Sequence, residues 1–177
     1  MSGKLWQSNL LMYDRSTDSL WSQVLGKAVV GPLVGTQLEL VASDIVSFGA
    51  FKKTHPKGKV LSEDTGASRR YGHDPYGSYY SSKEVMFPVR ARDDRLHEKD
   101  MVLGVIIEGQ PKAYSLKALQ GGGSVKDSIE DVSLVLKWNK ETQEVVITRE
   151  DAGARVVPFP GFWFSWVAAH PNTLLYK

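Results

Sequence analysis

The sequence predicts a mainly β protein, with an antiparallel, barrel-like sheet in a single domain over residues 1–177 and two short helices at its corners. Three observations support this prediction. Short apolar runs recur at intervals of about 10 residues between Gly, Pro and polar turns, which is typical of antiparallel strands. A helical spacing of apolar residues appears in two stretches only, and each of them ends at a His-Pro pair. A chain of 177 residues is also long enough to bury one sizeable core.

The N-terminal part of the chain predicts strands separated by tight turns. We expect strands at residues 9–13, 19–25, 27–30 and 36–41. Residues 19–25 alternate between apolar and polar side chains, the period of a half-buried strand. Glycine and proline punctuate the runs that follow, so each run is short.

A first helix is expected after these strands. Ser43 and Asp44 carry the short polar side chains that accept the free amides of a first helical turn. The apolar face of this helix has three residues spaced by three positions: Ile45, Phe48 and Phe51. Pro56 ends the helix, and an extended segment restarts at residues 60–61.

The second half of the chain predicts an extended run, two hairpins and a second helix. Residues 85–89 look extended. One hairpin joins residues 101–108 to 112–116, and another joins residues 132–138 to 145–149, each through a polar or glycine-containing turn. The three glycines at 121–123 indicate a flexible link. Residues 162–169 form an apolar helix that Pro171 ends.

Residues 48–61 and 163–176 follow one pattern, an aromatic-x-x-aromatic-x-x-x-His-Pro run with two apolar residues after it. Every matched pair is 115 positions apart, as from Phe48 to Trp163. Four aromatic residues fall in this way by chance in roughly one of 10⁴ trials. We interpret the two segments as an internal repeat, a duplicated corner where two buried aromatic rings hold a helix on a sheet. The matched pairs are Phe48–Trp163, Phe51–Trp166, His55–His170, Pro56–Pro171, Val60–Leu175 and Leu61–Tyr176.

Two histidines, His55 and His170, hold equivalent places at the ends of these helices. An imidazole at a helix C-terminus caps carbonyl groups, and positive charge is favoured there. A metal ion shared between the two copies is the alternative, but no carboxylate keeps a fixed spacing to both histidines.

Composition and charge exclude several classes of protein. The 22 Lys and Arg nearly balance the 20 Asp and Glu, which argues against a nucleic-acid binder. The absence of Cys excludes disulfides and thiolate metal sites. No apolar run approaches a membrane span and no signal peptide opens the chain, so the sequence leaves the compartment open. No phosphate-binding loop, Gly-x-Ser-x-Gly elbow or His-Glu-x-x-His motif is present.

The segment 69–80 is the strongest functional candidate. It is long for a loop without periodicity, and such loops are functional or disordered. Its tyrosines supply flat amphipathic surfaces, and Asp74 before Pro75 favours a tight turn in which the carboxylate accepts backbone amides. The alternative is a loop that only covers a sheet edge.

Two arginines extend this candidate site. Arg15 lies at the start of a turn that Asp14 is expected to stabilise, and Arg95 lies in a charged run at residues 93–99. Either guanidinium can bind a carboxylate or phosphate. The predicted ligand-binding residues are Arg15, Tyr71, Asp74, Tyr76, Tyr79 and Arg95.

Two functions remain open at this point. The first is a non-catalytic domain that binds a small ligand or a protein partner, with no cofactor, no metal, no nucleic acid and no membrane span. The second is a metal-assisted or acid–base hydrolase that uses His73, Asp94 and Arg95. Adjacent residues of an extended chain point to opposite faces, so Asp74 is badly placed to orient His73. The missing nucleophile–base pair favours the binding domain.

Several stretches of the chain also carry a family resemblance. They are residues 2–5, 8–15, 19–23, 31–36, 60–62, 74–76, 87–89, 94–96 with Lys99, 102–105 and 112–114. In combination they resemble the uncharacterised prokaryotic family called domain of unknown function 3179. The resemblance covers most of the chain and implies a fold rather than a chemistry.

The resemblance also implies a departure from longer members of that family, which look like two similar units in tandem. The chain starts inside the first unit, so it lacks a Trp-His-Glu and a Cys-Pro-Leu-Cys stretch that open that unit. We therefore expect a truncated or permuted arrangement, in which any metal or redox site built on those residues is missing.

Overall fold

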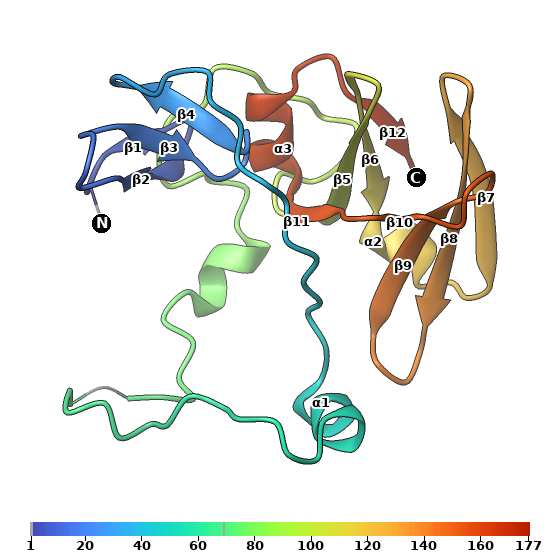
Figure 1. Ribbon diagram of the computed structural model, residues 1–177, viewed down its shortest axis with the longest axis horizontal. Helices are drawn as coiled ribbons and strands as arrows, with labels where there is room; N and C mark the ends of the chain where they lie inside the picture. Colours follow the sequence, from blue (N-terminus) through green and yellow to red (C-terminus); the bar gives the residue numbers. More distant parts are fainter. Residues whose placement is uncertain (1, 69) are drawn as a thin grey trace.

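The computed structural model describes residues 2–68 and 70–177 and contains three four-stranded sheets. Figure 1 shows their order across the molecule, with helix α3 (Trp163–Ala169) between the first sheet and the second. The mainly β prediction is confirmed. The barrel-like part of it is wrong, because each sheet stays open. Four strands are too few to close around a filled interior.

The N-terminal sheet is an antiparallel meander of β1 (Leu5–Trp6), β2 (Asn9–Tyr13), β3 (Leu20–Ser22) and β4 (Lys27–Val30). The turn between β2 and β3 depends on Asp14, as predicted. Its carboxylate accepts hydrogen bonds from the Thr17 hydroxyl at 2.7 Å and from the Ser16 amide at 2.8 Å. These bonds stabilise the charged form and lower the pKa of Asp14.

The central sheet has the order β11-β5-β6-β12. The predicted hairpin of β5 (Met101–Ile107) and β6 (Gln110–Ser115) forms its middle. On one side β11 (Phe159–Phe162) pairs antiparallel with β5, and on the other β12 (Leu174–Tyr176) pairs parallel with β6. Both edges of the hairpin are therefore occupied.

The outer sheet has the order β10-β9-β8-β7. Its strands are β7 (Ser124–Ile129), β8 (Val132–Asn139), β9 (Glu144–Arg149) and β10 (Arg155–Val156). The short helix α2 (Leu116–Leu119) leads into it from β6. Buried side chains of this sheet pack on those of one face of β5 and β6, and together they form the larger apolar core.

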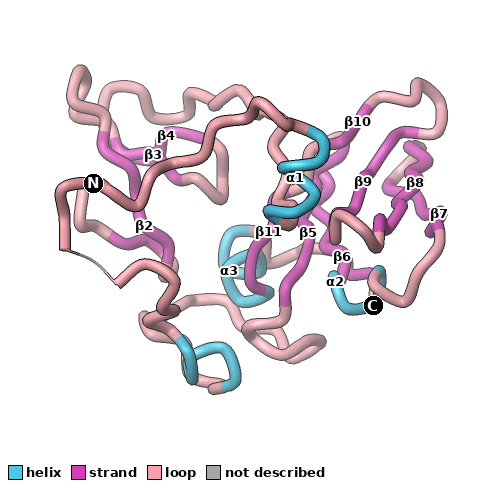
Figure 2. The backbone as a smooth tube through the Cα atoms, turned by 90° about the horizontal axis from the view of Figure 1, so that it is seen from below, coloured by secondary structure: helices cyan, strands magenta, loops and turns pink. Residues whose placement is uncertain are grey.

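Helix α3 is covered on both sides, and residues 163–168 are all buried. Trp163, Trp166 and Val167 pack on the other face of the central sheet. On the opposite side, the Ser165 hydroxyl donates a hydrogen bond of 3.1 Å to the side chain of Asn9 in β2. Figure 2 shows α3 between β2 and the β5–β11 pair from a second direction.

A close contact positions α3 on the central sheet. A Cβ atom placed on Gly104 would lie 2.2 Å from the Trp166 ring. The residue paired with Gly104 on β6 is Ala113, which is also fully buried. Two small residues on adjacent strands thus leave room for the indole to lie directly on the backbone. The indole nitrogen donates to the Thr173 hydroxyl at 2.8 Å, which satisfies its only polar group.

Several predicted elements differ from the structure. Residues 36–41 form no strand beyond an isolated bridge between Lys27 and Gln37, because the chain leaves the sheet there. Residues 85–89 also form no strand. Helix α1 (Phe48–Thr54) starts later than expected, because Ser47 provides the cap and Asp44 pairs with Arg155 instead. The sequence patterns do not predict β7 and β11, since one follows the glycine link and the other contains a proline.

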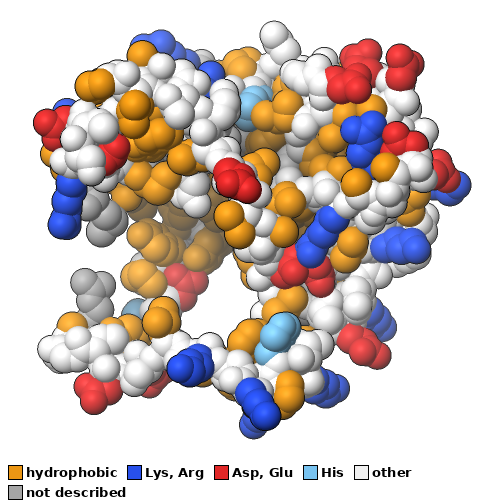
Figure 3. Space-filling view, viewed as in Figure 1, with side chains coloured by type: hydrophobic (Ala, Val, Ile, Leu, Met, Phe, Trp, Pro, Cys, Tyr) orange, Lys and Arg blue, Asp and Glu red, His pale blue; other side chains and the backbone are white. Residues whose placement is uncertain are grey.

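Residues 38–76 form an arm that extends away from the sheets and contains α1 (Figure 1). None of the described residues of the arm is buried, although many are large and apolar. Figure 3 shows hydrophobic side chains in the hollow that separates the arm from the sheets. Of the helices in the described part of the chain, none combines the length and the hydropathy needed to cross a bilayer.

The two predicted corners have the same backbone geometry. Both helices span seven residues, and their bounds are 115 positions apart. The residues that follow them, His55 and His170, have dihedral angles of −128°, 67° and −133°, 72°. Their surroundings differ, because α1 has no buried residue and Phe51 is only half-buried. The expectation that Phe51 is buried like Trp166 is therefore wrong, and the internal repeat stays a proposal.

His170 is half-buried and packs against the Trp166 ring at a tilt, with ring centres 4.2 Å apart. Its Nε2 atom is inaccessible to solvent and has no hydrogen-bond partner in the described part of the chain. Burial lowers the pKa of His170, because the charged imidazolium loses its water. Desolvation therefore opposes the positive charge that a helix C-terminus favours. The exposed His55 ring instead stacks on Phe51 and bonds the Thr54 hydroxyl.

We expect Gly104→Ala to destabilise the fold by about 1–3 kcal/mol, because the added methyl group overlaps the Trp166 ring and forces α3 away from the sheet. Urea unfolding measures this change. Gly49→Ala in the exposed helix α1, where nothing lies within 4 Å of the added atom, serves as the control. Equal midpoints for the two variants would contradict the close contact.

We expect the free energy of unfolding to fall as the pH is lowered from 7 towards 5. The pKa of His170 is lower in the folded state than its ordinary value of 6.5, so the unfolded chain binds the proton first. The carboxyl groups with lowered pKa values, such as Asp14 and Asp93, contribute only below about pH 4. His170→Gln should flatten the slope between pH 7 and 5. An unchanged slope in His170→Gln would exclude His170 as its source.

Candidate functional site

The segment after the arm returns to the sheets through a short 3₁₀ helix, η1 (Gly77–Ser81). Asp74 forms the turn before it and accepts the Tyr76 amide at 2.8 Å, as predicted. The same carboxylate lies at the Tyr80 hydroxyl and raises the pKa of Tyr80. Asp74 therefore orders this part of the loop. Arg69, the first residue of the predicted loop, lies outside the described residues.

Lys99 holds η1 on the body of the protein. Its ammonium group donates to the carbonyls of Tyr79 and Ser82, at 2.5 and 2.6 Å, and to the Ser82 hydroxyl at 2.9 Å. It also lies 3.6 Å from the centre of the Tyr79 ring. The side chain is buried, and these contacts compensate the cost of burying a charge. The position of Tyr79 thus depends on a residue 20 positions along the chain.

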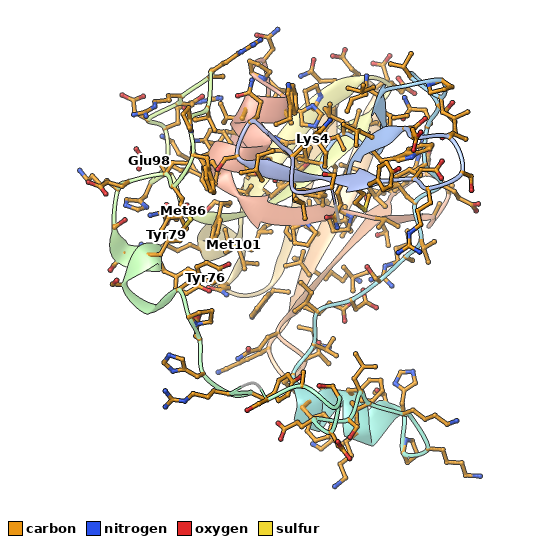
Figure 4. All side chains as sticks on the ribbon, turned by 90° about the vertical axis from the view of Figure 1, so that its left-hand side faces the viewer. Lys4, Tyr76, Tyr79, Met86, Glu98 and Met101 are labelled. Atoms are coloured by element: carbon orange, nitrogen blue, oxygen red, sulfur yellow. The ribbon has the colours of Figure 1, made fainter. Side chains whose placement is uncertain are left out.

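A first cavity, the aromatic cavity, lies between η1 and the N-terminal end of α3. Its volume is about 330 Å³. Figure 4 shows Tyr76, Tyr79 and Met86 between η1 and the sheets. The aromatic cavity is lined by Ser8, Asn9, Tyr76, Tyr79, Met86, Phe87, Phe159, Pro160, Gly161, Phe162, Phe164 and Ser165. Its walls are thus mainly apolar, with a few polar groups from β2 and α3.

A second cavity, the charged cavity, adjoins the first at Phe164, which lines both. Its volume is about 660 Å³. The lining residues are Val85, Val89, Arg92, Asp93, Asp94, Arg95, Glu98 and Phe164. The two cavities together present an apolar compartment next to a charged one.

The Arg95 guanidinium at this cavity is engaged in contacts within the protein. Its guanidinium binds both oxygens of Asp93 and donates to the Thr173 carbonyl at 3.0 Å. It also lies 5.3 Å from the centre of the Trp163 ring, and the Trp163 indole donates to the Asp93 carbonyl. The guanidinium lowers the pKa of Asp93. Asp93 and Arg95 therefore join the cavity wall to α3 and its following strand.

The remaining charged groups of this cavity are Arg92, Asp94 and Glu98. Within residues 2–68 and 70–177, none of their side chains forms an ion pair or a hydrogen bond. Two carboxylates and one guanidinium are thus free to meet a ligand. This balance favours a cationic group over an anionic one.

The structure brings part of the predicted site together. Tyr76 and Tyr79 line the aromatic cavity, and Arg95 lines the adjoining charged one. Arg15 is exposed and lines neither cavity. Tyr71 also lines neither, and its hydroxyl bonds Thr65 at 2.7 Å. Whether any of these residues binds a ligand remains a prediction.

The three residues of the hydrolase hypothesis are not gathered in one cavity. Asp94 and Arg95 line the charged cavity, whereas His73 is exposed in the arm and lines neither cavity. Among residues 2–68 and 70–177, no group of three His, Asp or Glu side chains is close enough to hold a metal ion.

Sequence reasoning missed the residues that α3 and β2 bring to the site. Phe164 and Ser165 face it from α3, and Asn9 faces it from β2, at least 155 positions earlier in the chain. The continuous apolar run of α3 could have predicted part of this, because a helix that is apolar on all sides must pack against a further element besides the central sheet. Nothing in the sequence identifies β2 as that cover.

We expect Lys99→Met to release η1. The carbonyls of Tyr79 and Ser82 would lose their donor, at a cost of about 1–3 kcal/mol. Hydrogen exchange should increase at residues 77–82 while the central sheet stays protected. Lys83→Met, at an exposed neighbouring lysine, is the matched control. Unchanged exchange in Lys99→Met would show that η1 is held by other contacts.

Comparison with known proteins gives a family and no further relative. No curated protein and no solved structure matches the chain. The family model described as "Protein of unknown function (DUF3179)" matches residues 1–159, which include the N-terminal sheet, the segment 69–80 and the central hairpin. The match ends at the first residue of β11, before α3 and β12. Because it covers most of the 177 residues, the chain belongs to the DUF3179 family.

Proposed function

We propose that the protein is a non-catalytic binding domain that takes an aromatic or branched apolar group in the aromatic cavity and a neighbouring cationic group in the charged cavity. The observation that carries this proposal is the junction of the two cavities at Phe164. Ligand sites combine an apolar compartment with a few placed polar groups, and this pair of cavities has that composition.

The aromatic cavity supports the apolar half of the proposal. Tyr76 and Tyr79 have ring centres 6.4 Å apart, and Phe162 stacks near Phe164 at 6.0 Å. Flat rings on two sides suit an aromatic side chain or a branched one. The Asn9 side chain accepts the Ser165 hydroxyl and donates one N–H to the Gln7 carbonyl. Its second N–H remains to meet a polar atom of the ligand.

The charged cavity supports the cationic half. Asp93 is neutralised by Arg95, which leaves Asp94 and Glu98 against Arg92. A short peptide with an aromatic residue next to lysine or arginine offers both groups at the spacing of adjacent side chains. The proposal therefore names a polypeptide segment as the ligand class.

We expect N-acetyl-Trp-Lys-amide to shift the amide resonances of residues 161–165 at millimolar concentration, and N-acetyl-Trp-Glu-amide to bind at least threefold more weakly. Added salt should reduce the difference between them. A complete absence of shifts at residues 161–165 would exclude the aromatic cavity as a site for either peptide.

Tyr76→Ala should weaken the binding of N-acetyl-Trp-Lys-amide at least fivefold, with a change in stability within about 0.5 kcal/mol, because this residue is 53% exposed. Tyr71→Ala is the matched control, because Tyr71 is 45% exposed in the same loop and lines neither cavity. Equal losses of binding in both variants would argue for a loop that only covers the sheet.

A further inference from the structure

The helix–turn corner at α1 in the arm is exposed, whereas the matching corner at α3 packs on the central sheet. Beyond the matched bounds of α1 and α3, the following backbone agrees as well. The amides of His55 and His170 both donate to the carbonyl four residues earlier, at 2.8 Å in each case. Gly58 then donates to the His55 carbonyl, as Thr173 does to that of His170. The two corners therefore have the same backbone conformation and the same backbone hydrogen bonds.

One pair of side chains follows the same correspondence. Trp166 needs an acceptor for its indole nitrogen and finds it in Thr173. Phe51 has no such nitrogen, and the residue at the position of Thr173 is Gly58, on which the Phe51 ring lies. Each aromatic residue thus has the neighbour that its chemistry requires.

The occupied corner shows what this structure packs on. Trp166, which is 1% exposed, lies on the Gly104–Ala113 pair of the β5–β6 hairpin. The chain then continues into β12, which adds to β6 as a parallel edge strand with Leu174 opposite Lys112. A corner of this kind therefore packs on a β-hairpin that has small residues beneath the aromatic ring.

The corner in the arm lacks this occupant. Phe48 is 62% exposed and Leu61 fully exposed. Their counterparts are the buried Trp163 and the half-buried Tyr176, which packs against the larger core. The hairpin of the same chain is not free, since β11, β12 and α3 already occupy both its edges and this face. A folded second copy has no free hairpin for the same reason.

Charge specifies the occupant further. Where α3 has the buried residues Val167 and Ala168, α1 has Lys52 and Lys53, which are exposed. Helix α1 is therefore suited to contact a partner with one face while its lysine-bearing face stays exposed to solvent. Lysines also stand at 57 and 59, and residues 45–62 contain no acidic residue. Figure 3 shows blue side chains around α1 at the bottom of the molecule.

We propose that residues 47–61 bind a β-hairpin of a partner protein. Phe51 lies on a pair of small residues in adjacent strands of that hairpin, and residues 59–61 add to its edge as a parallel strand, which is a known mode of recognition. In the register of β12, Lys59 stands where Leu174 meets Lys112. An acidic residue is therefore required at that place in the partner, because two lysines there repel each other.

The test uses the full chain, labelled with ¹⁵N, and a backbone-cyclised peptide of residues 101–115 whose hairpin structure is first verified by NOEs between Gly104 and Ala113. A second peptide carries Lys112→Glu. We expect the second peptide to slow hydrogen exchange at least tenfold at one of the adjacent amides of Val60 and Leu61, because alternate amides of a strand face the same neighbour. It should bind at least fivefold more tightly than the first.

Matched variants test the geometry. Phe51→Ala in the chain, or Gly104→Val in the Lys112→Glu peptide, should each weaken binding at least tenfold. Phe51→Trp combined with Gly58→Thr restores the residues of the α3 corner and should retain binding, which separates the contact itself from loss of helix α1. Tyr71→Ala and Tyr76→Ala should leave binding unchanged, so this result is independent of the aromatic cavity.

Three results would overturn the proposal. The first is exchange at Val60 and Leu61 that saturating peptide does not change. The second is equal binding of the unsubstituted peptide and the Lys112→Glu peptide. The third is a chain that self-associates without peptide and covers Phe51, which would make a second copy the occupant.

Discussion

The contact between the Trp166 ring and the backbone at Gly104 fixes the geometry on which the rest of the structure depends. It sets how closely α3 approaches the central sheet, and α3 in turn supports the N-terminal sheet through Ser165 and Asn9. The aromatic cavity forms where α3, β2 and β11 meet, so its shape follows from the same contact. The outer sheet is less involved, because it packs on the opposite face of β5 and β6.

Much of the fold was predictable where a local pattern decides the structure. The two hairpins at 101–115 and 132–149 and the strands at 9–13 and 27–30 appear as expected. A helix also precedes each His-Pro pair, although α1 begins later than predicted. Burial was not predictable from the same patterns. The corners at 55 and 170 have one backbone geometry, yet Phe51 is partly exposed and Trp166 buried. The burial of Trp166 depends on the hairpin on which it packs, and that contact is a property of the tertiary structure.

In the candidate site too, features set by local sequence were predictable and features set by tertiary contacts were not. The turn at Asp74 follows from local chemistry and was predicted with its hydrogen bond to a backbone amide. The role of Arg95 was not predictable, because its partners Asp93 and Thr173 combine a neighbour in sequence with a residue 78 positions away. Lys99 illustrates the limit most clearly. A lysine in a charged run is expected on the surface, but here it is buried among the carbonyls that end η1.

The position of α3 along the chain also determines the order in which the protein can assemble. Apart from β12, every strand that packs on this helix is synthesised before it, and the contact of Ser165 with Asn9 spans 156 positions. The N-terminal sheet and the central hairpin therefore emerge from the ribosome with the apolar faces that α3 will cover still open to solvent. Contacts of such long sequence separation close late and make folding slow. During synthesis these faces are exposed to chaperones and to other nascent chains. Docking of α3 then covers them and joins the N-terminal sheet to the central sheet.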